Sequence, residues 1–68
     1  MNNFSKRLTE LRKEKGLTQA ELADKLGVLQ RSVSHWENGT RECDFETLIK
    51  LSIIFNVSTD YLLGKTDY

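Results

Sequence analysis

Four glycines divide this 68-residue chain into short segments, and their spacing limits how long any helix can be. Glycine adopts the left-handed backbone conformation that ends helices at no steric cost. Apolar residues recur at helical spacing within the segments, for example at Phe4, Leu8 and Leu11. The glycines that end the segments are Gly16, Gly27, Gly39 and Gly64. We therefore expect several short amphipathic helices packed together.

The length leaves room for one domain with a small core, and a single cysteine, Cys43, allows no internal disulfide to reinforce it. One histidine and one cysteine cannot supply a four-ligand zinc site, so we expect no metal and no cofactor. The first residues do not resemble a signal peptide, and no apolar run reaches membrane-spanning length. We expect a soluble, cytoplasmic protein without a membrane partner.

Two helices in the middle of the chain are indicated by their caps and stripes. Thr18 and Glu21 form a capping box, in which each side chain can bind the backbone N–H of the other residue. The inner face of the helix that follows is expected to be Leu22, Ala23 and Leu26. After Gly27, a tight connection leads to a helix over residues 29–38, in which Val33 and Trp36 face the core.

A longer helix is expected from the cap residue Asp44 to Phe55. Its predicted inner face is Phe45, Leu48, Leu51, Ser52 and Phe55. Ile49, Ile53 and Ile54 lie off this face, which indicates a surface that something covers.

A last short helix follows, capped by Ser58 or Thr59. We interpret residues 1–64 as the folded domain and residues 65–68 as a polar tail. Cys43, in the loop before the longer helix, is expected to be a small packed residue, because no adjacent lysine or histidine favours its thiolate.

The segment over residues 29–38 is polar on its outer face, although the formal net charge of the chain is zero. The outward side chains are expected to be Gln30, Arg31, Ser34 and His35. Residues 1–41 hold eight Lys or Arg against five Asp or Glu, whereas residues 42–68 hold two against five. The positive part of the chain therefore carries the polar helix, although a solvated surface can also produce such an imbalance.

Two stretches carry a resemblance to a known family. Residues 17–28 read LTQAELADKLGV, and residues 32–39 read SVSHWENG. Together they resemble the Cro/cI-type (XRE) helix-turn-helix of phage and bacterial regulators. The similarity extends over nearly all of the chain and includes the Gln at the start of the second helix, the turn Gly and the Trp-Glu-Asn-Gly ending.

The resemblance implies an all-α, lambda-repressor-like bundle of five short helices, in which the second and third form the helix-turn-helix. Residues 29–38 would then lie in the major groove of double-stranded DNA. By position, the base-contacting residues would be Gln30, Arg31, Ser34, His35 and Leu29. Those contacting the DNA backbone would be Gln19, Ser32, Thr18, Arg41 and Thr40. For each, an ordinary solvated side chain is the alternative, and Ser34 can also point away from DNA.

Leu29 departs from the family, which usually has Ser or Thr there, so a helix cap of about 1 kcal/mol is missing. Its side chain either meets a thymine methyl or packs on the protein.

In the family, the residues matching Arg12 and Glu37 form a partly buried ion pair; the alternative is two separate solvated charges. Relatives in the family dimerise around the last helix. The resemblance therefore implies a dimer interface formed by Ser58, Tyr61, Leu62 and Ile53. The sequence is equally compatible with a Tyr61 side chain that packs in the core.

The function predicted on this basis is a sequence-specific transcriptional regulator, a repressor that acts as a homodimer on a palindromic operator. The alternative from another class is a small helical protein-interaction module, such as an antitoxin-like partner protein. We do not expect an enzyme, because the only histidine stands on the polar helix and no nucleophile and orienting acid can be assembled around it.

Overall fold

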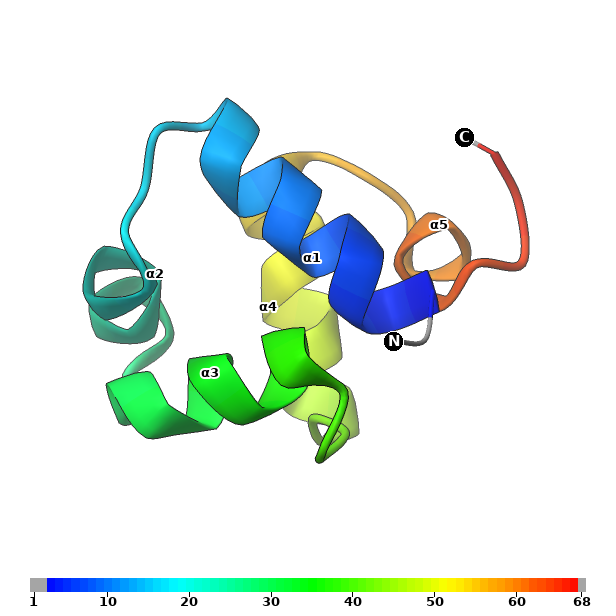
Figure 1. The fold of residues 1–68 in the computed structure, drawn as a ribbon. Helices are drawn as coiled ribbons and strands as arrows, with labels where there is room; N and C mark the ends of the chain where they lie inside the picture. The colour runs from blue at the N-terminus through cyan, green and yellow to red at the C-terminus, as the bar shows by residue number, and fades with distance from the viewer. Residues whose placement is uncertain (1–2, 68) are drawn as a thin grey trace.

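Five short α-helices make up the protein in a computed structural model that describes residues 3–67. They are α1 (Asn3–Glu14), α2 (Gln19–Leu26), α3 (Gln30–Asn38), α4 (Phe45–Phe55) and α5 (Thr59–Leu63). Helix α1 crosses the molecule, with α3 packed against it, α4 behind it and α5 beside its first turn, whereas α2 packs on α3 and α4 (Figure 1). Residues 3–67 contain no strand, so the predicted all-α bundle of five short helices is confirmed.

Local signals in the sequence place the ends of the helices. The capping box is formed: Thr18 Oγ1 accepts from the Glu21 amide at 3.0 Å, and Glu21 Oε1 accepts from the Thr18 amide at 2.9 Å. Gly39 ends α3 in the left-handed conformation, with φ of 76°, and its amide bonds back to the helix. Leu29 stands at the N-cap of α3 and makes no side-chain cap, as its chemistry requires.

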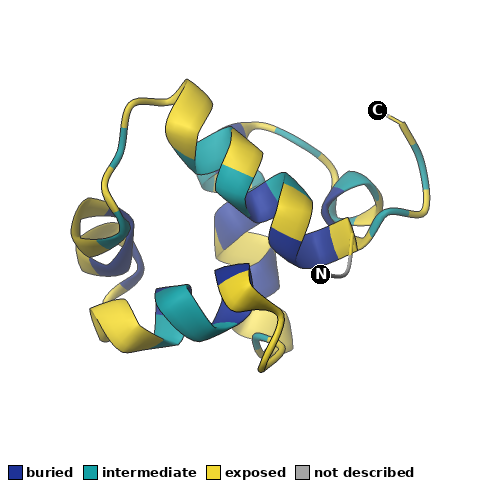
Figure 2. Ribbon diagram, in the orientation of Figure 1, coloured by how far each residue is buried: buried dark blue, intermediate teal, exposed yellow. Residues whose placement is uncertain are grey.

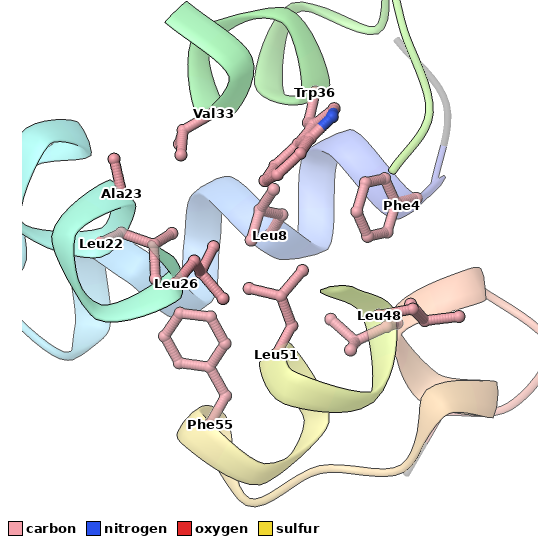
Figure 3. Packing of buried hydrophobic residues seen from close by; sticks show 11 residues of the cluster. Phe4, Leu8, Leu22, Ala23, Leu26, Val33, Trp36, Leu48, Leu51 and Phe55 are labelled. Atoms are coloured by element: carbon pink, nitrogen blue, oxygen red, sulfur yellow. The ribbon is translucent and has the colours of Figure 1, made fainter. Parts of the chain in front are cut away.

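One apolar core fills the space between the helices. Buried residues lie on the faces that α1, α2, α3 and α4 turn toward one another (Figure 2). Leu8 of α1 lies at the centre, between Trp36 of α3 and Leu51 of α4 (Figure 3). Burying each such side chain contributes roughly 1.5–3 kcal/mol, which is how a domain without a disulfide holds together. The core cluster comprises Phe4, Leu8, Leu22, Ala23, Leu26, Val33, Trp36, Leu48, Leu51, Phe55 and Leu62.

The predicted inner face of α4 is wrong at its first residue. Phe45 is 86% exposed, whereas Leu48, Leu51 and Phe55 are buried as predicted. At 3.6 residues per turn, Phe45 lies about 120° around the helix from Leu51, too far to share its face. The buried residue in that first turn is Thr47. Of the isoleucines predicted to lie outside, one packs partly against the core; that residue is Ile54.

The polar residues after α5 are attached to α1 and do not extend freely from the domain. Arg7 Nη1 donates to the Tyr61 carbonyl oxygen at 2.6 Å and to the Thr66 carbonyl oxygen, and Arg7 Nη2 lies 3.5 Å from Asp67 Oδ1. The Arg7 guanidinium also lies 4.2 Å from the centroid of the Tyr61 ring. The predicted polar tail therefore packs on the first helix over residues 65–67, and Tyr68 lies outside the described residues.

Candidate functional site

Helix α3 presents polar side chains on a rigid base. Val33 is fully buried and Trp36 is 7% exposed, so both fix the helix to the core. Gln30 and Arg31 on the opposite side are exposed, and Ser34 and His35 are half-buried at its edges. The spacing of three between the two anchors leaves the remaining surface of the helix to hydrogen-bonding groups. The structure therefore brings the predicted base-contacting residues to one surface.

Helices α2 and α3 form one closely packed unit. Gly27 has φ of 72° and turns the chain, and the Val28 amide then donates to the Ala23 carbonyl oxygen at 3.0 Å. Ala23 is 3% exposed and points toward Val33 of α3 (Figure 3). A small side chain at this contact lets the two helices approach closely. The short connection and the small residue together set the steep angle between α2 and α3 in Figure 1.

A buried ion pair joins α3 to α1. Arg12 Nε lies 2.7 Å from Glu37 Oε2, and Arg12 Nη2 donates to Glu37 Oε1 at 3.1 Å. The Glu37 side chain is 5% exposed and that of Arg12 13% exposed. Arg12 Nη1 also donates to the Leu17 carbonyl oxygen at 2.8 Å. The pair that the family resemblance implied is therefore present, and it ties the first helix, the loop after it and the polar helix together.

Three of the residues predicted to contact the DNA backbone already have side-chain hydrogen bonds within the protein, namely Gln19, Thr18 and Thr40. Gln19 Nε2 donates to Glu37 Oε1 at 3.1 Å, and the Thr18 hydroxyl accepts from the Glu21 amide. The amide hydrogen bond from Thr18 is also the main reason that the pKa of Glu21 lies below its ordinary value. The Gln19 side chain is half-buried, so its carbonyl oxygen and backbone are the groups left for another ligand.

An open cleft of about 550 Å³ lies between α3 and the loop that follows it. Its lining residues are Leu29, Arg31, Ser32, His35, Trp36, Arg41, Glu42, Cys43 and Asp44. His35 Nδ1 lies 3.1 Å from Thr40 Oγ1, and the Thr40 hydroxyl donates to the His35 carbonyl oxygen at 3.2 Å. Leu29 is 59% exposed at this rim, which answers the question of whether it packs inward.

Two carboxylates, those of Glu42 and Asp44, line the same cleft as Arg31 and Arg41. Sequence reasoning did not assign them to the site. An acid there weakens the local attraction for phosphate, because the positive potential is reduced. The pKa of Asp44 is lowered from its ordinary value, chiefly by a hydrogen bond to the Thr47 side chain, so this carboxylate is charged at neutral pH.

Cys43, at the base of the cleft, is packed as predicted. It is half-buried against the core, and burial, with the charges of Asp44 and Glu42 in support, raises the pKa of its thiol to about 11. A thiol with so high a pKa is a poor nucleophile at neutral pH.

The structure separates the four predicted dimer-interface residues. Leu62 is fully buried in the core, because α5 packs on α1 and α4, so it was wrongly assigned to an interface. The Ser58 hydroxyl caps α5 by accepting from the Tyr61 amide at 3.0 Å, and Tyr61 is half-buried beneath Arg7. Ile53, on α4, is 73% exposed.

Across residues 3–67, no three His, Cys, Asp or Glu side chains are grouped so that they could hold a metal ion. None of the helices described is both long enough and apolar enough to cross a membrane.

Comparison with known proteins adds a family and several relatives. A helix-turn-helix family model matches residues 8–62. The HTH-type transcriptional regulator ImmR of Bacillus subtilis (strain 168) is 48% identical over 65 residues, which is 96% of this chain and 51% of that protein. The chain thus spans about half the length of the curated relatives it matches.

Two solved structures share the fold and a third of the sequence. The P22 c2 repressor in complex with a synthetic operator gives a TM-score of 0.88 at 32% identity, covering 97% of this chain and 100% of that one. The biofilm regulator SinR in complex with DNA gives a TM-score of 0.80 at 34% identity, covering 88% of this chain and 97% of that one.

Proposed function

Because this chain belongs to the Cro/cI-type (XRE) helix-turn-helix family, we propose that it binds double-stranded DNA through α3 and regulates transcription. The observation that carries the proposal is the construction of α3. Val33 and Trp36 lock the helix to the core, while Gln30 and Arg31 stand exposed on its other side. A helix held in this way fits the major groove of B-DNA, where side chains near its N-terminus reach base edges.

The base-contacting residues that we propose are Gln30, Arg31, Ser34, His35 and Leu29. Gln pairs bidentately with adenine and Arg with the O6 and N7 of guanine, each with about 1–3 kcal/mol of discrimination. The exposed Leu29 side chain supplies an apolar contact for a thymine methyl group. His35 is held at the edge of the helix by Thr40, which suits it to a base or phosphate at the rim of the groove.

The DNA-backbone contacts that we propose are Ser32, Thr40, Arg41, Gln19 and Thr18. Ser32 and Arg41 line the cleft beside α3. The hydrogen bond from Gln19 Nε2 to Glu37 orients the side-chain amide group, so its carbonyl oxygen is held in one direction and can accept a hydrogen bond. Arg41 adds charge from the loop, but Glu42 next to it offsets part of that charge, so phosphate binding is expected to depend mainly on hydrogen bonds at this end.

We further propose that the protein is a cytoplasmic repressor, which acts by occupying its operator and excluding RNA polymerase. A homodimer would place two copies of α3 about 34 Å apart and match a palindromic site. The structural similarity to the P22 c2 repressor, which extends over the whole of that chain, supports a repressor. The chain spans about half the length of its curated relatives, so this proposal does not extend to any activity of their remaining halves.

The test is a DNA selection followed by a substitution. Sequences bound from a random pool give the site and its symmetry, and Arg31→Ala is then measured on the selected site and on scrambled DNA. We expect a loss of about 1–3 kcal/mol on the selected site only, with specificity relaxed at one base pair. Equal losses on both DNAs would make Arg31 a phosphate contact. Failure of the folded protein to bind any duplex at low salt would overturn the proposal.

A salt series separates this function from a protein-interaction module. Binding that neutralises several phosphates weakens steeply between low and moderate salt, because counterions are released from the DNA. An apolar protein interface changes little over the same range. A flat salt dependence for the selected duplex would therefore contradict the proposed mode of binding.

A further inference from the structure

Helix α4 carries an exposed apolar surface that the DNA-binding proposal does not use. Phe45, Ile49 and Ile53 are 86%, 55% and 73% exposed and follow one another at intervals of four residues. Residues at that spacing form a continuous ridge on a helix. We call these three residues the α4 stripe. An exposed apolar ridge on a domain with so small a core is costly in water unless another surface covers it.

We propose that the α4 stripe binds the α4 stripe of a second copy of this chain, in an antiparallel arrangement about a two-fold axis near Ile49. The proposal names the surface for the dimer suggested above, and it rests on contacts that do not involve DNA. In this arrangement Ile49 meets its own counterpart, and Phe45 lies against Ile53 of the second copy. Two ridges with this spacing pack side by side at a crossing angle of about 50°, the commonest arrangement of packed helices.

Charge on the flank of the stripe favours a second copy as the occupant. Glu46 and Lys50 form the neighbouring ridge, and Lys50 Nζ lies 3.8 Å from Glu46 Oε1 within the same helix. A two-fold axis between antiparallel helices reverses their order, so Glu46 of each copy faces Lys50 of the other. The flank is therefore complementary to itself, as an interface between identical surfaces must be. A parallel pairing about a two-fold axis would place the two Glu46–Lys50 flanks on opposite sides of the interface, so they would not pair with each other.

The surface beside Phe45 is also shaped to receive an apolar side chain. A hollow of about 220 Å³ lies there, at the N-terminal end of α4. Its lining residues are Phe4, Glu42, Cys43, Phe45, Leu48 and Leu63. In the antiparallel pair, the C-terminal end of the other α4 lies over this end, so Ile53 of the second copy is the side chain closest to the hollow.

The size of the surface sets the expected strength of the dimer. Helix α4 has 11 residues and is therefore about 16 Å long. A stripe on one such helix is smaller than the roughly 800 Å² that each partner contributes to a standard stable interface. We therefore expect a weak dimer in the absence of DNA, with a dissociation constant in the micromolar range or above.

The experiment is sedimentation equilibrium of the purified chain without DNA, over concentrations that reach the millimolar range. The wild type is expected to show a reversible monomer–dimer equilibrium. Ile49→Lys places two like charges at the two-fold axis and should leave a monomer throughout. Leu29→Lys is the matched control, because Leu29 is 59% exposed but stands on α3, and it should leave self-association unchanged. Circular dichroism verifies that both variants are folded.

A charge-reversal mixture tests the antiparallel arrangement. Glu46→Lys makes the flank wholly positive and Lys50→Glu makes it wholly negative, so each variant alone should dimerise about fivefold more weakly than the wild type. An equimolar mixture should form heterodimers and regain that loss. Mixing changes no contact within either helix, so a gain on mixing can arise only between chains.

Three outcomes would overturn the proposal: a wild type that stays monomeric at every concentration, an equal effect of Leu29→Lys and Ile49→Lys, or no gain on mixing the two charge variants. The first would leave another apolar protein as the occupant of the stripe, and the last would exclude the antiparallel arrangement. None of these outcomes depends on DNA, so the DNA-binding proposal is tested separately.

Discussion

Replacing Arg12 by methionine is expected to remove much of the stability of the folded domain. The substitution keeps a long apolar side chain but removes both hydrogen bonds from the guanidinium to Glu37. Glu37 is 4% exposed, so its carboxylate would remain in the core with the Gln19 amide as the donor still in place. A buried charge that loses its partner costs far more than the pair contributes when intact.

The magnitude follows from burial. Removing one partner of a buried ion pair costs about 3–5 kcal/mol, whereas an exposed pair is worth under about 1 kcal/mol. At about 0.05–0.15 kcal/mol per residue, a domain of this length has a total stability of roughly 3–10 kcal/mol. We therefore expect Arg12→Met to be partly unfolded at room temperature. The double variant Arg12→Met with Glu37→Met leaves no unpaired charge and should be more stable than the single variant.

Urea unfolding followed by fluorescence measures these differences directly. Trp36 is the only tryptophan in the chain and is 7% exposed, so its emission reports on the core. Glu46→Gln is the control, because it breaks an exposed pair with Lys50 and should cost about 0.5 kcal/mol or less. If Arg12→Met cost no more than this control, or if the double variant were less stable than Arg12→Met, the argument from the buried charge would be refuted.

Three further changes test other parts of the structure. Gly16 and Gly64 both have positive φ, so replacing either by alanine adds about 1–2 kcal/mol of backbone strain. Gly64→Ala should lower the stability in urea unfolding more than Gly16→Ala, because only at Gly64 would the new Cβ also collide with Asn3 at the start of α1. The Thr18 amide lowers the pKa of Glu21, so this contact stabilises the fold above the ordinary value of 4.5 and is lost as pH falls through the lower folded pKa. Glu21→Gln should therefore lose less of its urea midpoint than the wild type between about pH 7 and about pH 3. Burial raises the pKa of Cys43 to about 11, so the folded protein should react slowly with a disulfide reagent at about pH 8 and the urea-unfolded protein rapidly.

Those features of the fold that depend on neighbours in the sequence were predictable. The capping box at Thr18 and Glu21 and the stop at Gly39 involve groups within a few residues of one another, and they form as expected. The inward positions of Val33 and Trp36 follow from helical spacing alone. The outer face of α3 could be predicted for the same reason, since a helix with two apolar anchors has only one side left for its polar residues.

Features set by distant parts of the chain were not predictable in the same way. Phe45 is apolar, but its position in the first turn of α4 leaves its side chain exposed to solvent. Leu62 lies beneath α1 and α4, an arrangement that the five-residue helix around it does not reveal. The link from Gln19 to Glu37 and the attachment of residues 65–67 to Arg7 join segments 18 or more positions apart. Such contacts depend on the angles between helices, which local patterns leave open.

The attachment of the last residues to Arg7 brings the two ends of the described chain together. Asp67 is bonded to α1 four residues after its start at Asn3, and Gly64 lies against the Asn3 side chain. A short flexible linker can therefore close the chain into a ring, which can be reopened in the exposed loop over residues 40–42. Such a circular permutant would keep every helix intact, and so would grafting the domain into a surface turn of an unrelated carrier protein.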